Sequence, residues 1–381
     1  MAKLREVCFQ ITDGSHNPPS GVEQSEYLML SSKNIDDDFI TLDSPRFLSH
    51  SDYIAENKRT TVSEGDLLMT IVGTVGRVAI VPKELNGICL QRSVAVIKPE
   101  REIVNNRYLM YQLQNMRPFL EKEARGVAQK GIYLKQVSQL DIKLPELEHQ
   151  MQIVKVLDKV TELISLRKQQ LTKLDELVKA RFVEMFGDPV KNTMDWEIKS
   201  LSELGELNRG VSKARPRNSP ELLGGPYPLI QTGEVANAKT YITSFNSTYS
   251  EKGLAQSKMW PKGTLCITIA ANIAQTSILT FDACFPDSVV GFISRNMTNE
   301  LFIHYWFSFF QKILDEQAPQ VAQKNINLKI LSELNVIVPP LSLQNRFAAF
   351  VERVDQQKQT VQQSLEKLEL MKKALMQEYF G

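Results

Sequence analysis

The chain contains a long internal repeat, and this feature constrains its fold more than any other. The stretch "VAQKGIYL" at 127–134 recurs as "VAQKNINL" at 321–328. Sliding the chain by 194 positions aligns 127–187 with 321–381 without a gap, and 22 of the 61 aligned residues are identical. Ordinary composition would match roughly one position in fifteen by chance. The period is far longer than the ~20 to 50 residues of a solenoid repeat, so the sequence predicts a duplicated domain.

The first part of each copy has the pattern of strands. "DLLMTIVG", "RVAIVP" and "SVAVIKP" are short β-branched runs separated by Gly and Pro. The upstream similarity continues here, because "GDLLMTIVGTVGRVAI" at 65–80 parallels "GTLCITIAANIAQTSI" at 263–278. Helical stretches that begin at Asn105 and Asn299 are mixed in. We therefore expect an α/β or α+β domain in each copy.

The second part of each copy is predicted to be one long helix, at about 146–186 and 341–380. Apolar residues recur every seven positions, and Gly187 followed by Pro189 is a strong helix stop. A helix of ~40 residues is ~60 Å long. Each helix could lie along its own domain, but as copies of one another they are expected to pair, antiparallel and with pseudo-two-fold symmetry. The predicted pairing residues are Leu157, Ile164, Leu171, Leu174, Val178, Val354, Val361, Leu365, Leu368 and Leu375.

Charge is balanced, with a formal net charge of +1. A polyanion would therefore have to be held by local patches rather than by a global field. The clearest patch is "NRGVSKARPRNSP" at 208–220, which has no acidic residue and suits contacts to phosphates or guanine edges. A merely solvated basic loop is the alternative. The corresponding place in the first copy reads "TDGSHNPPSG", so the two domains are expected to present different surfaces.

The sequence gives little sign of enzymatic chemistry. It contains no phosphate-binding loop of the G-x-x-x-x-G-K-(S/T) kind, no C-x-x-C pair and no H-E-x-x-H. "NPPS" at 17–20 is similar to the motif of adenine methyltransferases, but Ser20 stands where that motif has an aromatic residue, and we expect a Pro-rich turn. Apolar runs are too short to span a membrane and the N-terminus lacks the apolar core of a signal peptide, so the expected location is the cytoplasm.

The whole chain resembles the specificity subunit of type I restriction-modification enzymes. The resemblance is carried by "QKGIYLKQVSQLDIKLPELEHQMQIVKVLDKV" and "QKNINLKILSELNVIVPPLSLQNRFAAFVERV", in which a strand and a Pro-x-Leu-x-x-Gln turn lead into the long helix. "GDLLMTIVGTVGRVAIVP" and "ITDGSHNPP" add to it. The first copy departs mildly, with "PELEHQ" where "PPLxxQ" is usual.

This resemblance implies an α+β chain with two α/β target-recognition domains, 1–145 and 188–338, each followed by a helical spacer, 146–187 and 339–381. Such a chain is a non-catalytic reader of a bipartite, asymmetric site on double-stranded DNA. It would dock two modification subunits, which use S-adenosylmethionine, and associate with ATP- and Mg-dependent restriction subunits. The residues expected to contact DNA are Ser15, His16, Asn17, Lys33, Arg77, Arg92, Gln129, Lys130, Arg209, Lys213, Arg215, Arg217, Gln323 and Lys324.

Two other classes of function stay open at this stage. The chain could be a coiled-coil adaptor whose two domains bind protein, which its neutral charge would suit, and salt-sensitive DNA binding would separate the two interpretations. A complete methyltransferase is the third possibility, and binding of S-adenosylmethionine by the isolated chain would reveal it.

Overall fold

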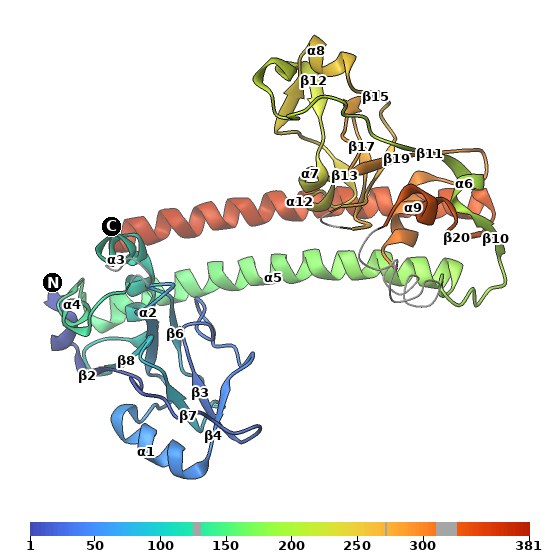
Figure 1. Ribbon diagram of the computed structural model, residues 1–381. Coiled ribbons are helices and arrows are strands. Elements are labelled where there is room, and N and C mark those ends of the chain that lie inside the picture. Colours follow the sequence, from blue (N-terminus) through green and yellow to red (C-terminus); the bar gives the residue numbers. More distant parts are fainter. Residues whose placement is uncertain (125–130, 271–272, 310–325) are drawn as a thin grey trace. The chain divides into compact units, whose positions relative to one another are not determined.

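The computed structural model describes residues 1–124, 131–270, 273–309 and 326–381. The chain divides into two compact units, and the boundaries between them fall inside the two long helices. Unit 1 comprises 1–168 and 363–381, and unit 2 comprises 169–362. Two continuous helices of 40 residues, α5 (Leu147–Phe186) and α12 (Leu341–Phe380), therefore each contribute one part to unit 1 and the other to unit 2 (Figure 1).

Unit 1 is built on a four-stranded sheet with the order β2-β8-β5-β6. Its strands are β2 (Cys8–Asp13), β5 (Leu67–Thr70), β6 (Val78–Ile80) and β8 (Val94–Pro99). A three-stranded sheet of order β4-β3-β7 consists of β3 (Tyr27–Leu30), β4 (Arg46–Leu48) and β7 (Ile88–Leu90). A short pair joins β1 (Ala2–Lys3) to β9 (Asp141–Ile142).

The two central strands of the four-stranded sheet in unit 1, β5 and β8, are buried on both faces. Because side chains alternate along a strand, Leu67 and Met69 enter a core shared with the helices, while Leu68 enters a second cluster toward the three-stranded sheet. Besides its parts of α5 and α12, the helices among the described residues of the unit are η1 (Leu4–Glu6), α1 (His50–Thr60), α2 (Asn106–Asn115), α3 (Arg117–Glu123) and α4 (Leu134–Ser138). The helical stretch predicted from Asn105 is thus two helices, since Pro118 cannot be accommodated inside a continuous one.

Unit 2 repeats this plan with one extra strand in each large sheet. The first has the order β11-β19-β16-β17-β13, from β11 (Gly205–Arg209), β13 (Tyr241–Ile242), β16 (Leu265–Thr268), β17 (Thr276–Leu279) and β19 (Val289–Ser294). The second has the order β14-β12-β18-β15, from β12 (Leu223–Leu229), β14 (Ser247–Tyr249), β15 (Met259–Trp260) and β18 (Ala283–Cys284). A short pair joins β10 (Glu197–Ser200) to β20 (Asn335–Val338).

The helices of unit 2 other than the long ones are short. They are α6 (Leu201–Leu204), η2 (Pro220–Leu222), α7 (Thr232–Asn237), α8 (Glu251–Ala255), α9 (Glu300–Phe307) and α11 (Leu328–Ser332). The sequence-based prediction of a duplicated α+β domain with a long helix after each copy matches these elements.

Within each unit, the parts of α5 and α12 run in opposite directions. In unit 1, Leu157 shares a core with Met376 and Phe380, while Lys168 is ion-paired with Glu369 at 3.3 Å. In unit 2, Phe186 packs on Phe347 with ring centroids 5.5 Å apart, while Asp175 is ion-paired with Lys358 at 2.6 Å. Moving forward along α5 therefore means moving backward along α12, as the duplication predicts.

Candidate nucleic-acid interface

In unit 1, the predicted DNA-contacting residues near the N-terminus lie where β2 ends, beside the loop between β7 and β8. The Ser15 carbonyl accepts a hydrogen bond from the Arg92 amide at 2.9 Å, which joins the two segments. Ser15 is buried, whereas His16 and Asn17 are exposed. The His16 Nε2 lies 2.8 Å from the carboxylate of Asp13. This end of the domain therefore presents polar side chains on a backbone held by hydrogen bonds.

Three cations predicted to bind DNA come from neighbouring loops of unit 1. The Ser32 amide donates to Ser93 Oγ at 3.0 Å, which places Lys33 and Arg92 on adjoining segments. Both are exposed, and neither side chain has a hydrogen bond or ion pair with the residues that the structure describes. Arg77 is different because it is paired with Asp36 at 3.4 Å. Lys33 and Arg92 are thus the more available for a phosphate.

Four further predicted contacts fall on segments whose structure is not described. Gln129 and Lys130 precede Gly131, and Gln323 and Lys324 lie in 310–325. These four predictions therefore lie outside the described residues.

In unit 2, the basic stretch is a strand end followed by a well-anchored loop. Arg209 is the last residue of β11. Gln256 holds the loop, because its side-chain oxygen accepts from the amides of Lys213 at 2.6 Å and Ala214 at 2.9 Å. Arg215 donates to the carbonyl of Ala214 at 2.8 Å and to a second carbonyl of the loop at 2.7 Å. Much of the Arg215 guanidinium is therefore used to hold its own loop.

The fold brings an acidic residue to this stretch, which the sequence of the loop itself lacks. Asp287, from the connection between β18 and β19, accepts from Arg217 at 2.6 Å and lies 3.8 Å from Arg215. Arg209 and Lys213 stay exposed, without a side-chain partner among the described residues. Of the four predicted cations, Arg215 and Arg217 are therefore partly neutralised, whereas Arg209 and Lys213 are available.

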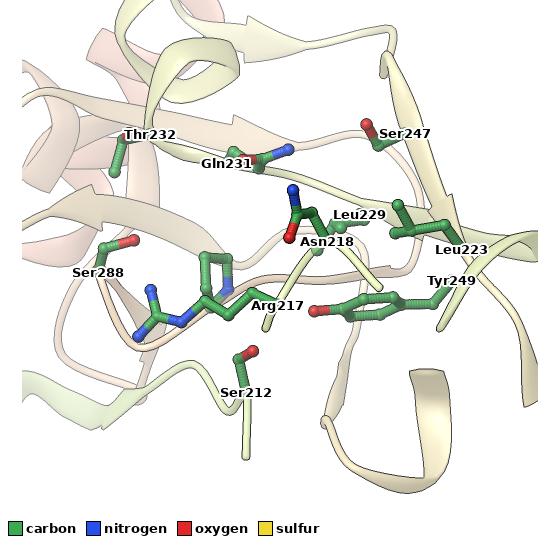
Figure 2. A pocket seen from close by; sticks show the side chains of 11 residues that line it. Ser212, Arg217, Asn218, Leu223, Leu229, Gln231, Thr232, Ser247, Tyr249 and Ser288 are labelled. Atoms are coloured by element: carbon green, nitrogen blue, oxygen red, sulfur yellow. The ribbon is translucent and has the colours of Figure 1, made fainter. Parts of the chain in front are cut away.

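A cavity of about 150 Å³ lies beside this ion pair. Figure 2 shows Arg217 and Asn218 on one side, with the Tyr249 hydroxyl pointing toward the Arg217 side chain. The rest of the lining is Ser212, Leu223, Leu229, Gln231, Thr232, Ser247, Pro286 and Ser288. Its walls mix hydrogen-bonding groups with the ring of Tyr249, which suits a polar, planar group such as a base edge.

This cavity occupies the same place in unit 2 as the polar end does in unit 1. The backbone after β2 and β11 approaches the neighbouring strand so closely that only glycine fits. A Cβ on Gly14 would lie 2.0 Å from the Leu90 carbonyl oxygen, and one on Gly210 would lie 2.3 Å from that of Phe285. The two copies therefore share a backbone frame at this site.

The shared frame makes individual positions comparable, and one of them differs in charge sign. The Ile71 amide donates to the Ser93 carbonyl at 2.9 Å, and the Ile269 amide donates to the Ser288 carbonyl at 3.0 Å. The residues before these serines are Arg92 in unit 1 and Asp287 in unit 2. A cation in one copy and an anion in the other thus occupy equivalent positions, so the two surfaces differ in charge at this point.

The predicted pairing residues of the helices divide between the two units. In unit 1, Leu157 is buried and Leu375 packs against the same core. Leu365 is also buried, whereas Ile164 and Leu368 are half-buried. In unit 2 the corresponding set is Val178 and Val354 in the core, Leu174 packed against it, Val361 buried and Leu171 half-buried.

The helices also carry two seam lysines that the apolar pattern did not single out. Lys358 and Lys372 continue the seven-residue spacing of Val351, Leu365 and Tyr379. Lys358 Nζ lies 2.6 Å from Asp175 and 3.3 Å from Asp355. Lys372 Nζ lies 3.5 Å from Asp38 in unit 1 and 5.6 Å from the centre of the Tyr111 ring. The sequence signal that could have identified these lysines is a charged residue at a heptad position that is otherwise apolar.

Metal sites and reactive thiols are the other kinds of site that a chain of this composition could carry. The described residues contain no group of three or more His, Cys, Asp or Glu side chains that could hold a metal ion. Cys89, Cys266 and Cys284 are buried, and burial raises the pKa of the Cys8 and Cys89 thiols to about 12, so both stay protonated at neutral pH. None of the described helices is long and apolar enough to cross a membrane.

Comparison with known proteins agrees with this architecture. The family model described as the type I restriction modification DNA specificity domain matches residues 30–176 and 193–370. The chain is 23% identical over 348 residues to the putative type I restriction enzyme MjaX specificity subunit of Methanocaldococcus jannaschii, covering 85% of this chain and 80% of that protein. It is 29% identical over 153 residues to the EcoBI specificity subunit of Escherichia coli, covering 40% and 31% of the two chains.

Solved structures share the fold. The S subunit of the type I restriction-modification system of M. genitalium matches with a TM-score of 0.59 and 14% identity, over 100% of this chain and 95% of that one. A chain solved in work on complex assembly and conformational transition of the type I R-M system matches with a TM-score of 0.60 and 18% identity, over 100% and 96%. With its two repeats each matched by the family model, the chain belongs to the type I restriction-modification DNA specificity family, as a specificity subunit.

Proposed function

We propose that the two globular domains, 1–145 and 188–338, each read one half of a bipartite, asymmetric DNA site, and that the helices set the distance between the halves. Bases are distinguishable by their edges in the major groove, whereas phosphate contacts only fix position. The exposed Lys33, Arg92, Arg209 and Lys213 would contact phosphates, and the polar groups around them would contact bases.

One observation supports this proposal above the others. The two domains keep the same backbone approach at Gly14 and Gly210 but carry Arg92 and Asp287 at equivalent positions. A backbone that is kept while the charge of a side chain on it changes sign is what two readers of different half-sites require. An adaptor whose two domains bound the same protein would have no need of two unlike surfaces in the same place.

Catalysis is proposed to belong to the partner subunits. Two modification subunits would dock on the helical regions and methylate adenine with S-adenosylmethionine, while restriction subunits would use ATP and Mg. This chain would then recognise the DNA sequence and hold the partner subunits together, and would be non-catalytic by itself.

The test is replacement of one domain. A chain in which 188–338 comes from a specificity subunit with a different target is produced with its partner subunits, and the methylated sites of the host genome are sequenced. The proposal expects one half of the methylated sequence to change while the other half and the spacer stay. A motif that changes in both halves, or in neither, would contradict it.

A salt series separates this proposal from the protein-binding adaptor. If Lys213 and Arg209 contact phosphates, Lys213→Glu and Arg209→Glu should each weaken binding and reduce the slope of log affinity against log salt by about one unit. Exposed Lys252, paired with Glu221 at 3.0 Å, gives the matched control Lys252→Glu, which should leave the slope unchanged. DNA binding by the assembled complex that is insensitive to salt in every variant would favour the adaptor.

A further inference from the structure

We propose that Arg217 reads a guanine in the half-site of the second domain and that Asp287 is the residue that positions it. This inference rests on the proposed function, because it assigns one base contact within a domain taken to read DNA. It is carried by an ion pair, an anchored loop and a cavity, all in unit 2.

The first step concerns which donors of Arg217 are free. Its Nη2 donates to Asp287 Oδ1 at 2.6 Å, while Nη1 and Nε have no hydrogen-bond partner among the described residues. The side chain is 43% exposed and lines the cavity beside Asn218. A guanidinium held at one corner keeps its remaining N–H groups in a fixed plane. Nη2 keeps a second N–H, which forms a parallel pair with the N–H of Nε or of Nη1, and that pair suits bidentate donation to two acceptors.

The second step concerns the backbone that carries Arg217. Gln256 accepts from two successive amides of the loop, and Ser257 Oγ donates to the Val211 carbonyl at 2.7 Å. The loop is therefore fixed at its base before any ligand arrives. A side chain on an anchored loop, itself tied by a carboxylate, loses little conformational entropy when it binds.

The third step decides between a base and a phosphate. Asp287 is paired with Arg217, so a phosphate brought to the free N–H groups of Arg217 would meet the repulsion of the carboxylate, although Arg215, 3.8 Å from Asp287, leaves the three groups with one net positive charge. A base edge carries no net charge, so the carboxylate repels it much less. Guanine is the only base whose major-groove edge offers two neighbouring acceptors, N7 and O6, whereas adenine offers one acceptor and one donor.

The experiment measures the methylated motif in hosts that carry the full complex. The wild-type half-site of domain 2 is expected to contain a G·C pair. Arg217→Ala should relax that one position, lowering discrimination against the other bases by roughly 5- to 150-fold. Asp287→Ala should relax the same position to a smaller degree, and Asp287→Glu should restore part of it. The double variant should be no more relaxed than Arg217→Ala, since both act through one contact.

Controls separate the possible failures. Lys213→Ala, on the same loop, should lower methylation evenly without changing the motif. Thermal unfolding and co-purification with the partner subunits show that each variant folds and assembles, which the 38% exposure of Asp287 favours.

Two outcomes would overturn the inference. They are a domain 2 half-site without a G·C pair, and an Arg217→Ala variant that methylates less at all sites with an unchanged motif, as a phosphate contact would. If domain replacement still changes that half of the motif, the proposed function stands although this assignment fails.

Discussion

A buried glutamine at the start of each long helix shows what the repeated Pro-x-Leu-x-x-Gln turn does. Gln150 accepts from the Asn105 amide at 2.8 Å and donates to the Pro145 carbonyl at 2.8 Å. Gln344 accepts from the Asn299 amide at 3.1 Å and donates to the Pro339 carbonyl at 2.8 Å. Neither side chain is exposed. The repeated glutamine therefore fastens each helix to the domain that precedes it.

Replacing either glutamine should destabilise the chain. Gln150→Leu leaves the Asn105 amide and the Ile103 carbonyl without their partner, and each such buried group costs about 1–3 kcal/mol. We expect a loss of about 2–5 kcal/mol in the free energy of unfolding, measured by denaturant titration. Gln152→Leu, the same substitution at an exposed position of α5, should change it by less than about 0.5 kcal/mol. Equal losses of unfolding free energy in the two variants would show that Gln150 does not attach the helix to the domain.

His304 predicts how stability depends on pH. Burial and the charge of Lys358 lower the pKa of His304 to about 4, from 6.5. The unfolded chain therefore binds more protons than the folded chain between these pH values, so stability should fall as pH drops from 6.5 toward 4. His304→Gln should flatten this part of a thermal-unfolding profile. His149→Gln, at an exposed position, should leave it unchanged, and a His304→Gln profile as steep as the wild type would contradict the argument.

At the scale of elements, the long helices were predictable from the sequence, whereas the polar contacts of the candidate site were not. The predicted ranges 146–186 and 341–380 agree with Leu147–Phe186 and Leu341–Phe380, because heptad spacing and a Gly-x-Pro stop are local signals. Arg217 and Asp287 lie 70 residues apart in the sequence, and no local pattern in either segment predicts that the two side chains pair. The strand pattern likewise indicated the sheets but could not show which loops gather at one end of a domain.

The Lys358 ion pairs give a prediction for the helix pair of unit 2. Lys358→Met would leave the half-buried Asp175 and the largely buried Asp355 without their cation. We expect a loss of about 2 kcal/mol, below the cost of a fully buried broken pair because Asp175 is partly solvated. Burial already raises the pKa of Asp355, so adding Asp355→Asn should recover part of the loss. Lys173→Met, at an exposed position of α5, is the control in the same denaturant series.

For the whole molecule, the spacer hypothesis needs an insertion that spares both cores. Ala180 lies between Val178 and Phe182, which are buried in the core of unit 2, so an insertion after Ala180 would disrupt that domain. Four residues inserted after Lys168 and four after Gln362 fall instead at the boundary of the units. They add ~6 Å of helix and rotate the downstream part of each helix by about 40°, and a base pair advances ~3.4 Å.

Methylome sequencing of this double insertion should show unchanged half-sites separated by about two more unread base pairs. The control is an insertion in only one helix. It makes the two helices unequal in length, so it should reduce methylation without changing the number of unread base pairs between the half-sites. Altered half-site bases with the original spacer would show that the helices do not measure distance.

The discontinuity of unit 1 has a consequence for synthesis on the ribosome. Met376 and Phe380 complete a core whose other members lie before residue 158, so the first domain emerges about 200 residues ahead of the segment that closes it. At 5–20 residues per second, this interval is roughly 10 to 40 s. During that time the apolar face of the nascent domain has only solvent, or a chaperone, to cover it. The core of the first domain is therefore completed only after α12 has been made.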